Sequence, residues 1–164
     1  MRTGSFIAIF FILVGLSIQT ASAQAGLQQQ RVEQTDDCSG DASSCAMDAL
    51  WSHNGRAFLK WAQVAVAKGD HTPAYWLGEV FESGDKKMNI QADIVRAYMW
   101  YDIAALLQAR EIQKLPPATD PSFAQTNQQA INYRDGVARE MTAAQVNEAL
   151  RLEKEWLTKH GIRM

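Results

Sequence analysis

The sequence predicts an all-α protein, and three observations lead to this prediction. Apolar residues recur at helical spacing through most of the chain from residue 44 to residue 157. Glycine, proline and helix-capping residues interrupt this pattern between the expected helices. No stretch combines strand alternation with hairpin turns. The length of 164 residues corresponds to one domain.

Residues 1–23 have the three regions of a secretory signal peptide. Arg2 is basic, residues 6–18 form an uncharged apolar run, and Ala21 and Ala23 offer small side chains to a signal peptidase. We therefore expect cleavage after Ala23 and a periplasmic or secreted protein. A retained membrane anchor is the alternative, but the apolar run is shorter than the roughly 20 residues that span a bilayer.

The remainder of the chain is mildly acidic. Removing Arg2 with the signal peptide changes the net charge from −2 to −3. This balance gives no general attraction to nucleic acid or to anionic lipid. We expect no nucleic-acid partner, no cofactor and no membrane span after cleavage.

Cys38 and Cys45 are the only cysteines, and both follow the signal peptide. An even number of cysteines in an exported chain predicts a disulfide, here closing a short loop worth roughly 2–3 kcal/mol. A metal site is the alternative. It is disfavoured because C-x6-C without a nearby histidine matches no zinc pattern.

The domain organisation follows from composition and from helix start and stop signals. Residues 24–42, rich in Gln, Asp and Ser, predict a flexible polar leader, and residues 160–164 a short tail. The helical domain is expected between them, at 43–159. Its helices are expected from near Ser44 to the Asn54-Gly55 break, at 56–68, at 73–83, from Asp93 to about Ala109, at 122–139, and from the Thr142-x-x-Gln145 capping box onward.

Local signals support the middle of this scheme. Gly69 and Gly84 are placed to end helices, and Asp70, His71 or Thr72 can cap the helix at 73–83. That helix is apolar on two sides, so it must be packed on two sides. The segment from Asp85 to Lys87 is expected to be a solvated loop.

Small and aromatic residues recur in a fixed order through residues 62–105. The pattern A…G…A-x-x-L-G-x-x-[YF]-x-x-G…D-x-x-x-A-x-x-W-Y-x-x-A-A resembles a Sel1-like repeat, a relative of the tetratricopeptide repeat. The residues that carry it are Ala62, Gly69, Ala74, Leu77, Gly78, Phe81, Gly84, Asp93, Ala97, Trp100, Tyr101, Ala104 and Ala105.

The resemblance implies a short α-solenoid of antiparallel helix pairs that binds proteins or peptides. Some members of the family are periplasmic and regulate envelope signalling or polysaccharide production, and some cysteine-rich members bind penicillin or cleave β-lactams. This chain has only one complete repeat, and a proline-rich insertion follows Ala105. The flanking helices are therefore expected to act as caps.

The sequence gives only weak evidence for catalytic residues. Ser83-x-x-Lys86 matches the short motif of penicillin-recognising serine enzymes, but the S-D-N and K-T-G motifs are absent and the serine sits at a helix end. His53, His71 and His160 have no carboxylate or histidine four residues on, and we interpret them as surface or capping residues. We predict no catalytic and no metal-binding residues.

The remaining candidates concern binding. The five tryptophans lie in apolar stripes and are predicted to pack between helices rather than to form a ligand groove. Tyr75, Glu79 and Glu82 share the side of the helix at 73–83 that is left over after packing, and the first helix of a repeat lines the concave surface. These three residues are the predicted binding site.

Taken together, the sequence predicts a non-enzymatic exported adaptor that binds a protein or peptide on a concave helical surface. Two alternatives remain open. One is a cell-wall or β-lactam-directed hydrolase of the same repeat family, and the other is a small structural subunit of an envelope complex.

Overall fold

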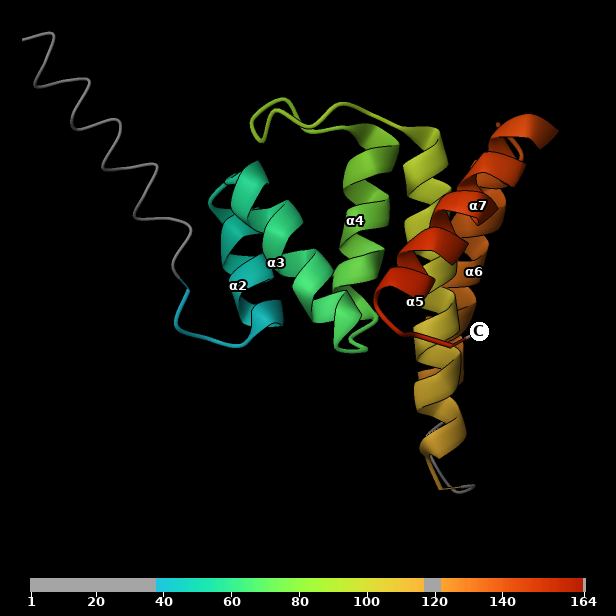
Figure 1. Cartoon of the computed structure of the whole chain (residues 1–164), viewed down its shortest axis with the longest axis horizontal. Coiled ribbons are helices and arrows are strands. Elements are labelled where there is room, and N and C mark those ends of the chain that lie inside the picture. The colour runs from blue at the N-terminus through green and yellow to red at the C-terminus, as the bar shows by residue number, and fades with distance from the viewer. Residues whose placement is uncertain (1–37, 117–121, 164) are drawn as a thin grey trace, which may run out of the picture. The chain divides into compact units, whose positions relative to one another are not determined.

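Six α-helices follow one another in the part of the chain that the computed structural model describes, residues 38–116 and 122–163 (Figure 1). These residues form no strand, only an isolated bridge within one loop. The predicted all-α class is therefore confirmed. The predicted signal peptide at 1–23, and residues 24–37 of the predicted leader, lie outside the described residues.

The first two helices, α2 (Ala42–Trp51) and α3 (Gly55–Ala67), pack against each other and start at side-chain caps. The carboxylate of Asp41 accepts hydrogen bonds from two backbone N–H groups in the first turn of α2. The amide oxygen of Asn54 accepts one from the first turn of α3. Because Asp41 caps α2, this helix starts earlier than predicted, and the predicted leader at 24–42 extends too far.

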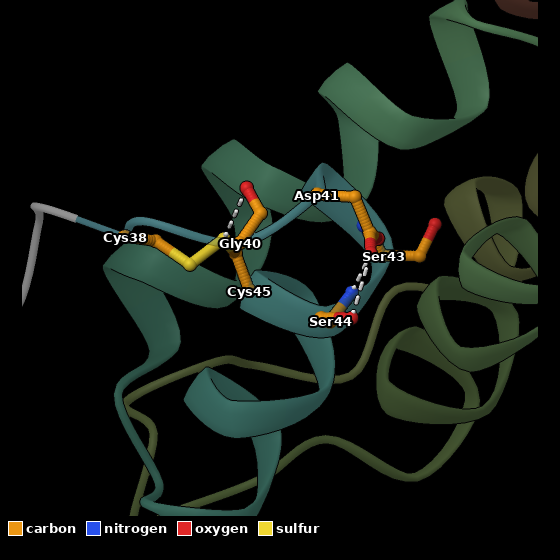
Figure 2. The surroundings of a disulfide bond; sticks show 6 residues. All are labelled: Cys38, Gly40, Asp41, Ser43, Ser44 and Cys45. Carbon is orange, nitrogen blue, oxygen red and sulfur yellow. Dashed lines mark hydrogen bonds between the residues drawn. A yellow bond between two sulfur atoms is a disulfide. The ribbon is translucent and has the colours of Figure 1, made fainter.

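A disulfide joins Cys38 to Cys45 and holds the start of the described chain against the first turn of α2 (Figure 2). The two Cα atoms are 5.7 Å apart, in the usual range for such a bond. Cys45 is buried, and its sulfur lies 3.6 Å from the carbonyl oxygen of Gly40. The predicted pairing is confirmed, and together with the Asp41 cap it fixes how the chain enters the first described helix.

The next two helices, α4 (Thr72–Ser83) and α5 (Ile94–Lys114), share the most extensive helix contact in the described chain. The predicted stop signals are confirmed, since Gly69 and Gly84 have φ values of +97° and +69°. Residues with a Cβ rarely adopt such values. Asp93 caps α5 by accepting two backbone hydrogen bonds from its first turn.

Helix α5 continues beyond the predicted end near Ala109 and ends at Lys114. The next residue, Leu115, has extended backbone angles. A residue that precedes proline is disfavoured in a helix, and Pro116 follows Leu115. The proline-rich segment therefore ends this helix, as expected, but at its own position rather than upstream of it.

Helices α4 and α5 approach closely where Gly78 faces Tyr101. A Cβ atom on Gly78 would lie 2.5 Å from two ring carbons of Tyr101. The Tyr101 side chain is fully buried, with 0% exposed. Since a close-packed interior leaves such a ring no room to shift, only glycine is compatible with this approach of the two helices.

The loop between α4 and α5, residues 84–93, folds onto the turn between α2 and α3. Asp85 Oδ1 accepts hydrogen bonds from the backbone N–H groups of Lys87 (2.7 Å) and Met88 (3.0 Å). Met88 is buried, and its carbonyl oxygen lies only 2.2 Å from where a Cβ on Gly55 would be. The loop predicted to be solvated, Asp85 to Lys87, has exposed lysine side chains, and burial begins directly after it, at Met88.

The last two helices, α6 (Ser122–Ala138) and α7 (Ala143–Lys159), both pack on α5 (Figure 1). The predicted capping box starts α7. Thr142 Oγ1 accepts a hydrogen bond from the backbone N–H of Gln145 (3.3 Å), and Gln145 Oε1 accepts one from the backbone N–H of Thr142 (2.9 Å). The backbone N–H groups at the start of a helix have no carbonyl acceptor within it, and these reciprocal bonds provide acceptors for two of them.

The predicted tail at 160–164 turns back onto the core as far as it is described. Gly161 has φ +69°, and the N–H of Ile162 donates to the carbonyl oxygen of Leu157 (3.0 Å). This left-handed ending brings Ile162 against the core. The residues after α7 therefore belong to the folded unit.

The tryptophans follow the packing prediction with one exception. Trp100 is buried and stands edge-on to Trp156, with ring centroids 5.1 Å apart. Trp61 and Trp76 are partly buried against the core. Trp51, in contrast, is 78% exposed, so the prediction is wrong there. It is the last residue of α2, a helix that packs on α3 and α4 and leaves this corner in solvent.

One hydrophobic core extends through all six described helices. Its largest fully buried side chains include Phe58 from α3, Leu77 from α4, Tyr101 and Ile103 from α5, and Leu157 from α7. Among the residues that the structure describes, no helix combines the length and the hydropathy needed to cross a bilayer.

Replacing Gly78 by alanine should lower the free energy of unfolding by about 1–3 kcal/mol, because the new methyl group overlaps the buried Tyr101 ring. Helix propensity alone would favour alanine by roughly 0.5–1 kcal/mol, so a net loss identifies the contact. Urea unfolding followed by circular dichroism measures it. Gly136→Ala in α6 is the matched control and should cost nothing, since the nearest atom to its new Cβ is a terminal nitrogen of Arg139 at 3.8 Å. Equal losses in both variants would contradict this account.

Candidate functional site

The three predicted binding residues lie on α4, the helix between the α2–α3 pair and α5. Glu79 and Glu82 are exposed. Tyr75 is partly buried and packs against the core. The two carboxylates therefore reach solvent, whereas the tyrosine lies between helices.

Two further tyrosines, one from α5 and one from α6, join these residues. The ring centroid of Tyr75 lies 5.7 Å from that of Tyr101 and 5.4 Å from that of Tyr133. Tyr101 and Tyr133 stack with centroids 5.5 Å apart. The hydroxyl of Tyr101 donates a hydrogen bond to Glu82 Oε2 (2.7 Å). We call Tyr75, Glu79, Glu82 and Tyr133, together with the buried Tyr101 that supports them, the Tyr–Glu surface.

The prediction that Tyr75 lies on a side left over after packing is wrong. Tyr133 of α6 meets Tyr75 edge-on, so α6 covers part of this side of α4. The residues around Tyr75 gave no sign of this, because α6 lies far along the chain and is connected through the proline-rich segment. No local pattern identifies Tyr133 as a member of the site.

The electrostatics of the Tyr–Glu surface favour neutral phenols beside carboxylates. Burial raises the pKa of Tyr75, and its hydrogen bond with Tyr133 and the charge of Glu79 raise it further. Burial, with the hydrogen bond to Glu82 and the charge of Glu82, also raises the pKa of Tyr101. Burial raises the pKa of Glu79, while its hydrogen bond from Tyr75 acts in the opposite direction.

This arrangement suits binding rather than nucleophilic chemistry. Phenols with raised pKa values stay protonated near neutral pH and are poor nucleophiles and bases. Aromatic faces attract cations, and carboxylates form charge-assisted hydrogen bonds with ammonium and guanidinium groups. Within the described residues, no lysine or arginine pairs with Glu79 or Glu82. The surface is therefore chemically matched to a cationic group from outside the chain.

The residues of the repeat pattern occupy interior positions or helix ends. Gly69, Gly84 and Asp93 stand at helix ends. The others are buried in the α3, α4 and α5 packing: Ala62, Ala74, Leu77, Gly78, Phe81, Ala97, Trp100, Tyr101, Ala104 and Ala105.

Ser83 lies at the carboxyl end of α4, where its hydroxyl donates to the carbonyl oxygens of Glu79 (3.0 Å) and Gly84 (3.2 Å). The serine of penicillin-recognising enzymes instead starts a helix and contacts its lysine. Lys86 lies in the exposed part of the following loop. The positions of Ser83 and Lys86 therefore give no support to a catalytic role for this motif.

Two of the three histidines face carboxylates that are distant in sequence. His71 Nδ1 lies 3.0 Å from Glu111 Oε2, and His53 Nδ1 lies 3.9 Å from Asp85 Oδ2. The suggestion that His71 helps cap α4 is wrong, because its side chain makes no capping bond. Asp70 accepts the hydrogen bond of the Thr72 N–H instead (2.9 Å).

Across residues 38–116 and 122–163, no three His, Cys, Asp or Glu side chains gather in a way that could hold a metal ion.

A partly buried charge cluster joins α5, α6 and α7, and it was not predicted from the sequence. Arg134 Nη1 donates to Asp102 Oδ1 (2.8 Å), and Glu153 is 8% exposed beside them. Burial, the charge of Asp102 and a hydrogen bond to Asp102 raise the pKa of Glu153 to about 8. A carboxylic acid at 153 therefore donates to the Asp102 carboxylate, which also receives Arg134.

A signal for this cluster was present in the sequence. Glu153 lies four residues from both Ala149 and Leu157, in the middle of the apolar stripe of α7. A glutamate at such a position is either neutral or paired when buried. What the sequence could not provide was the identity of its partners on α5 and α6.

No protein-family model matches this chain, and neither the curated proteins nor the solved structures contain a match. The resemblance to Sel1-like repeats therefore stays a prediction that rests on the residues quoted above.

The raised pKa of Glu153 predicts that stability falls as the pH rises from its ordinary value of 4.5 to about 8. In this window the folded protein keeps a proton that the unfolded chain loses. The stabilisation that protonated Glu153 contributes to the folded state is fully present below pH 4.5 and lost above about pH 8. Glu153→Gln still offers a donor to Asp102 but cannot ionise, so it should remove this part of the pH dependence.

Free energies of unfolding in urea at about pH 5, 7 and 9 measure this effect for the two proteins. Glu140→Gln, at an exposed turn between α6 and α7, is the control and should keep the original slope. An unchanged slope in Glu153→Gln would show that Glu153 ionises normally.

Proposed function

We propose that this protein is an exported helical-repeat adaptor whose Tyr–Glu surface binds a protein segment carrying lysine or arginine. The observation that carries the proposal is the gathering, from three helices, of three tyrosine rings and of two carboxylates that form no ion pair within the described residues. Three further considerations support it: the packing of the helices, the chemistry of the surface and the signs of export.

The packing of the described helices is compatible with a short solenoid. Each helix from α2 to α5 packs on the next one along the chain, and α2 and α4, as well as α5 and α7, also meet. Contacts of this local kind are what stacked helix pairs make. The resemblance of residues 62–105 to a Sel1-like repeat adds support, because its buried residues lie in the α3, α4 and α5 packing.

The chemistry of the surface specifies the partner. Tyr133 is 39% exposed, and its ring is held in place by the rings of Tyr75 and Tyr101. Because the side chain is already ordered, binding a partner to it costs little conformational entropy. A cation over such a ring gains about 0.5–2 kcal/mol, and a carboxylate adds a charge-assisted bond. A basic segment of another protein satisfies both groups at once.

Export is supported by two features that follow each other in the sequence. Residues 1–23 have the form of a signal peptide, and the Cys38–Cys45 disulfide follows in the chain. Disulfides persist outside the reducing cytosol. A periplasmic or secreted location accounts for both.

Export with cleavage after Ala23 predicts a processed protein that starts at Gln24. N-terminal sequencing and intact mass of protein from the periplasm or medium test this, with Cys38 and Cys45 resistant to a thiol reagent until reduction. Ala23→Leu, which removes the small residue before the cleavage point, should accumulate the precursor. Full-length protein with reactive thiols in the cytosol would contradict the proposal.

A photo-reactive amino acid at Glu79 should cross-link a discrete partner in cells, and mass spectrometry of the adduct should locate the cross-link beside lysine or arginine residues. Glu82→Lys in the same protein should reduce this capture about 5- to 30-fold, because it replaces an attraction with a repulsion of roughly 1–2 kcal/mol.

Glu140→Lys is the matched control, since it makes the same charge reversal at an exposed site away from the Tyr–Glu surface. It should leave capture unchanged. The proposal fails if no partner is recovered, or if the two reversals reduce capture equally, because the effect would then come from net charge alone.

A further inference from the structure

A polar groove of about 800 Å³ lies apart from the Tyr–Glu surface. Three segments line it: the turn between α3 and α4, the carboxyl-terminal part of α5, and the chain after α7. Four cationic side chains converge on it from these segments. They are Lys68, Arg110, Lys114 and Arg163.

These four cations differ from three arginines elsewhere in the described chain. Arg96, Arg134 and Arg151 each form an ion pair with a nearby carboxylate. Within residues 38–116 and 122–163, none of the four groove cations has a carboxylate at ion-pair distance. A protein with a negative net charge therefore has four positive side chains without an ion-pair partner on one concave surface.

The two carboxylates that line the groove are already engaged. Asp70 accepts hydrogen bonds from the hydroxyl of Ser43 and from the backbone N–H of Thr72. Glu111 pairs with His71 at 3.0 Å. Counting both as negative, the groove still has a net charge of about two positive units, and neither carboxylate is placed to neutralise the four cations.

The two histidines of the groove are oriented by their Nδ1 atoms. His160 Nδ1 lies 2.8 Å from the carbonyl oxygen of Trp156, which can only accept, so this nitrogen holds the proton. His71 Nδ1 faces the carboxylate of Glu111 in the same way. In the neutral form of both rings Nε2 is then an acceptor, so it suits a hydroxyl group of a ligand and not a phosphate oxygen. Gly69 and Gly161 leave open space where side chains would stand.

We propose that this groove binds a ligand through a phosphate group. A phosphate monoester carries about −1.5 to −2 charges at neutral pH and three acceptor oxygens, which match the two excess positive charges and the N–H donors of the four cationic side chains. A single carboxylate would leave half of that charge unpaired. Arg110 and Lys114 lie one helical turn apart on α5 and reach the groove side by side, so they form the centre of the site.

Inorganic pyrophosphate is the probe, titrated into the purified protein by calorimetry at low salt and again at about 0.15 M salt. We expect saturable binding that weakens with salt. The double variant Arg110→Gln, Lys114→Gln should bind about tenfold or more weakly, the size of a lost charge-assisted hydrogen bond. Lys86→Gln, Lys87→Gln is the matched control, because it removes two exposed cations from the loop between α4 and α5. It should bind like the original protein.

A second arm distinguishes a soluble phosphate from a lipid headgroup. Flotation with vesicles that contain phosphatidic acid, whose headgroup is a phosphate monoester, and with vesicles of phosphatidylcholine alone shows whether the same double variant loses binding to the anionic vesicles only. Loss of pyrophosphate binding, of anionic-vesicle binding or of both in the groove variant alone supports the proposal and names the source. If the original protein binds neither pyrophosphate nor the anionic vesicles, or if the control variant loses as much binding as the groove variant, the proposal is overturned. Circular dichroism of both variants checks that each is folded.

Discussion

The contact of Gly78 with Tyr101 is the constraint on which the rest of the structure depends. It lets α4 and α5 come together without a side chain between them, and it leaves the Tyr101 ring fully buried with its hydroxyl at Glu82. The same ring then supports Tyr75 on one side and Tyr133 on the other. A glycine in one helix thus decides where a helix far along the chain can dock.

Helix α5 connects two surfaces of opposite charge. Tyr101, in its first half, belongs to the surface with Glu79 and Glu82, and Arg110 and Lys114, near its end, belong to the cationic groove. Nine residues of helix place these regions about 14 Å apart along the axis. The cations lie at the carboxyl end of the helix, where the backbone dipole favours positive charge. The two ligands that we propose, one basic and one anionic, would therefore contact the same helix.

Local rules predicted much of the fold, and tertiary contacts decided what they missed. Gly69, Gly84 and the Thr142 capping box were predictable because each depends on a few neighbouring residues. The burial of Tyr75 under Tyr133, and the pairing of Glu153 with Asp102, depend on how α6 and α7 return to α5 after the proline-rich segment. A glutamate in an apolar stripe shows that a partner must exist but not which helix supplies it.

The loop between α4 and α5 limits how this fold could have been built. Solenoids commonly lengthen when a unit is copied, since each unit touches only its neighbours. Here Met88 lies against Gly55, and the loop thereby fastens the central helix pair to the preceding one. A unit inserted between α3 and α4 would separate these residues and expose a buried methionine. The contact of this loop with Gly55 therefore makes the connection between α3 and α4 a place where the fold does not tolerate an added helix pair.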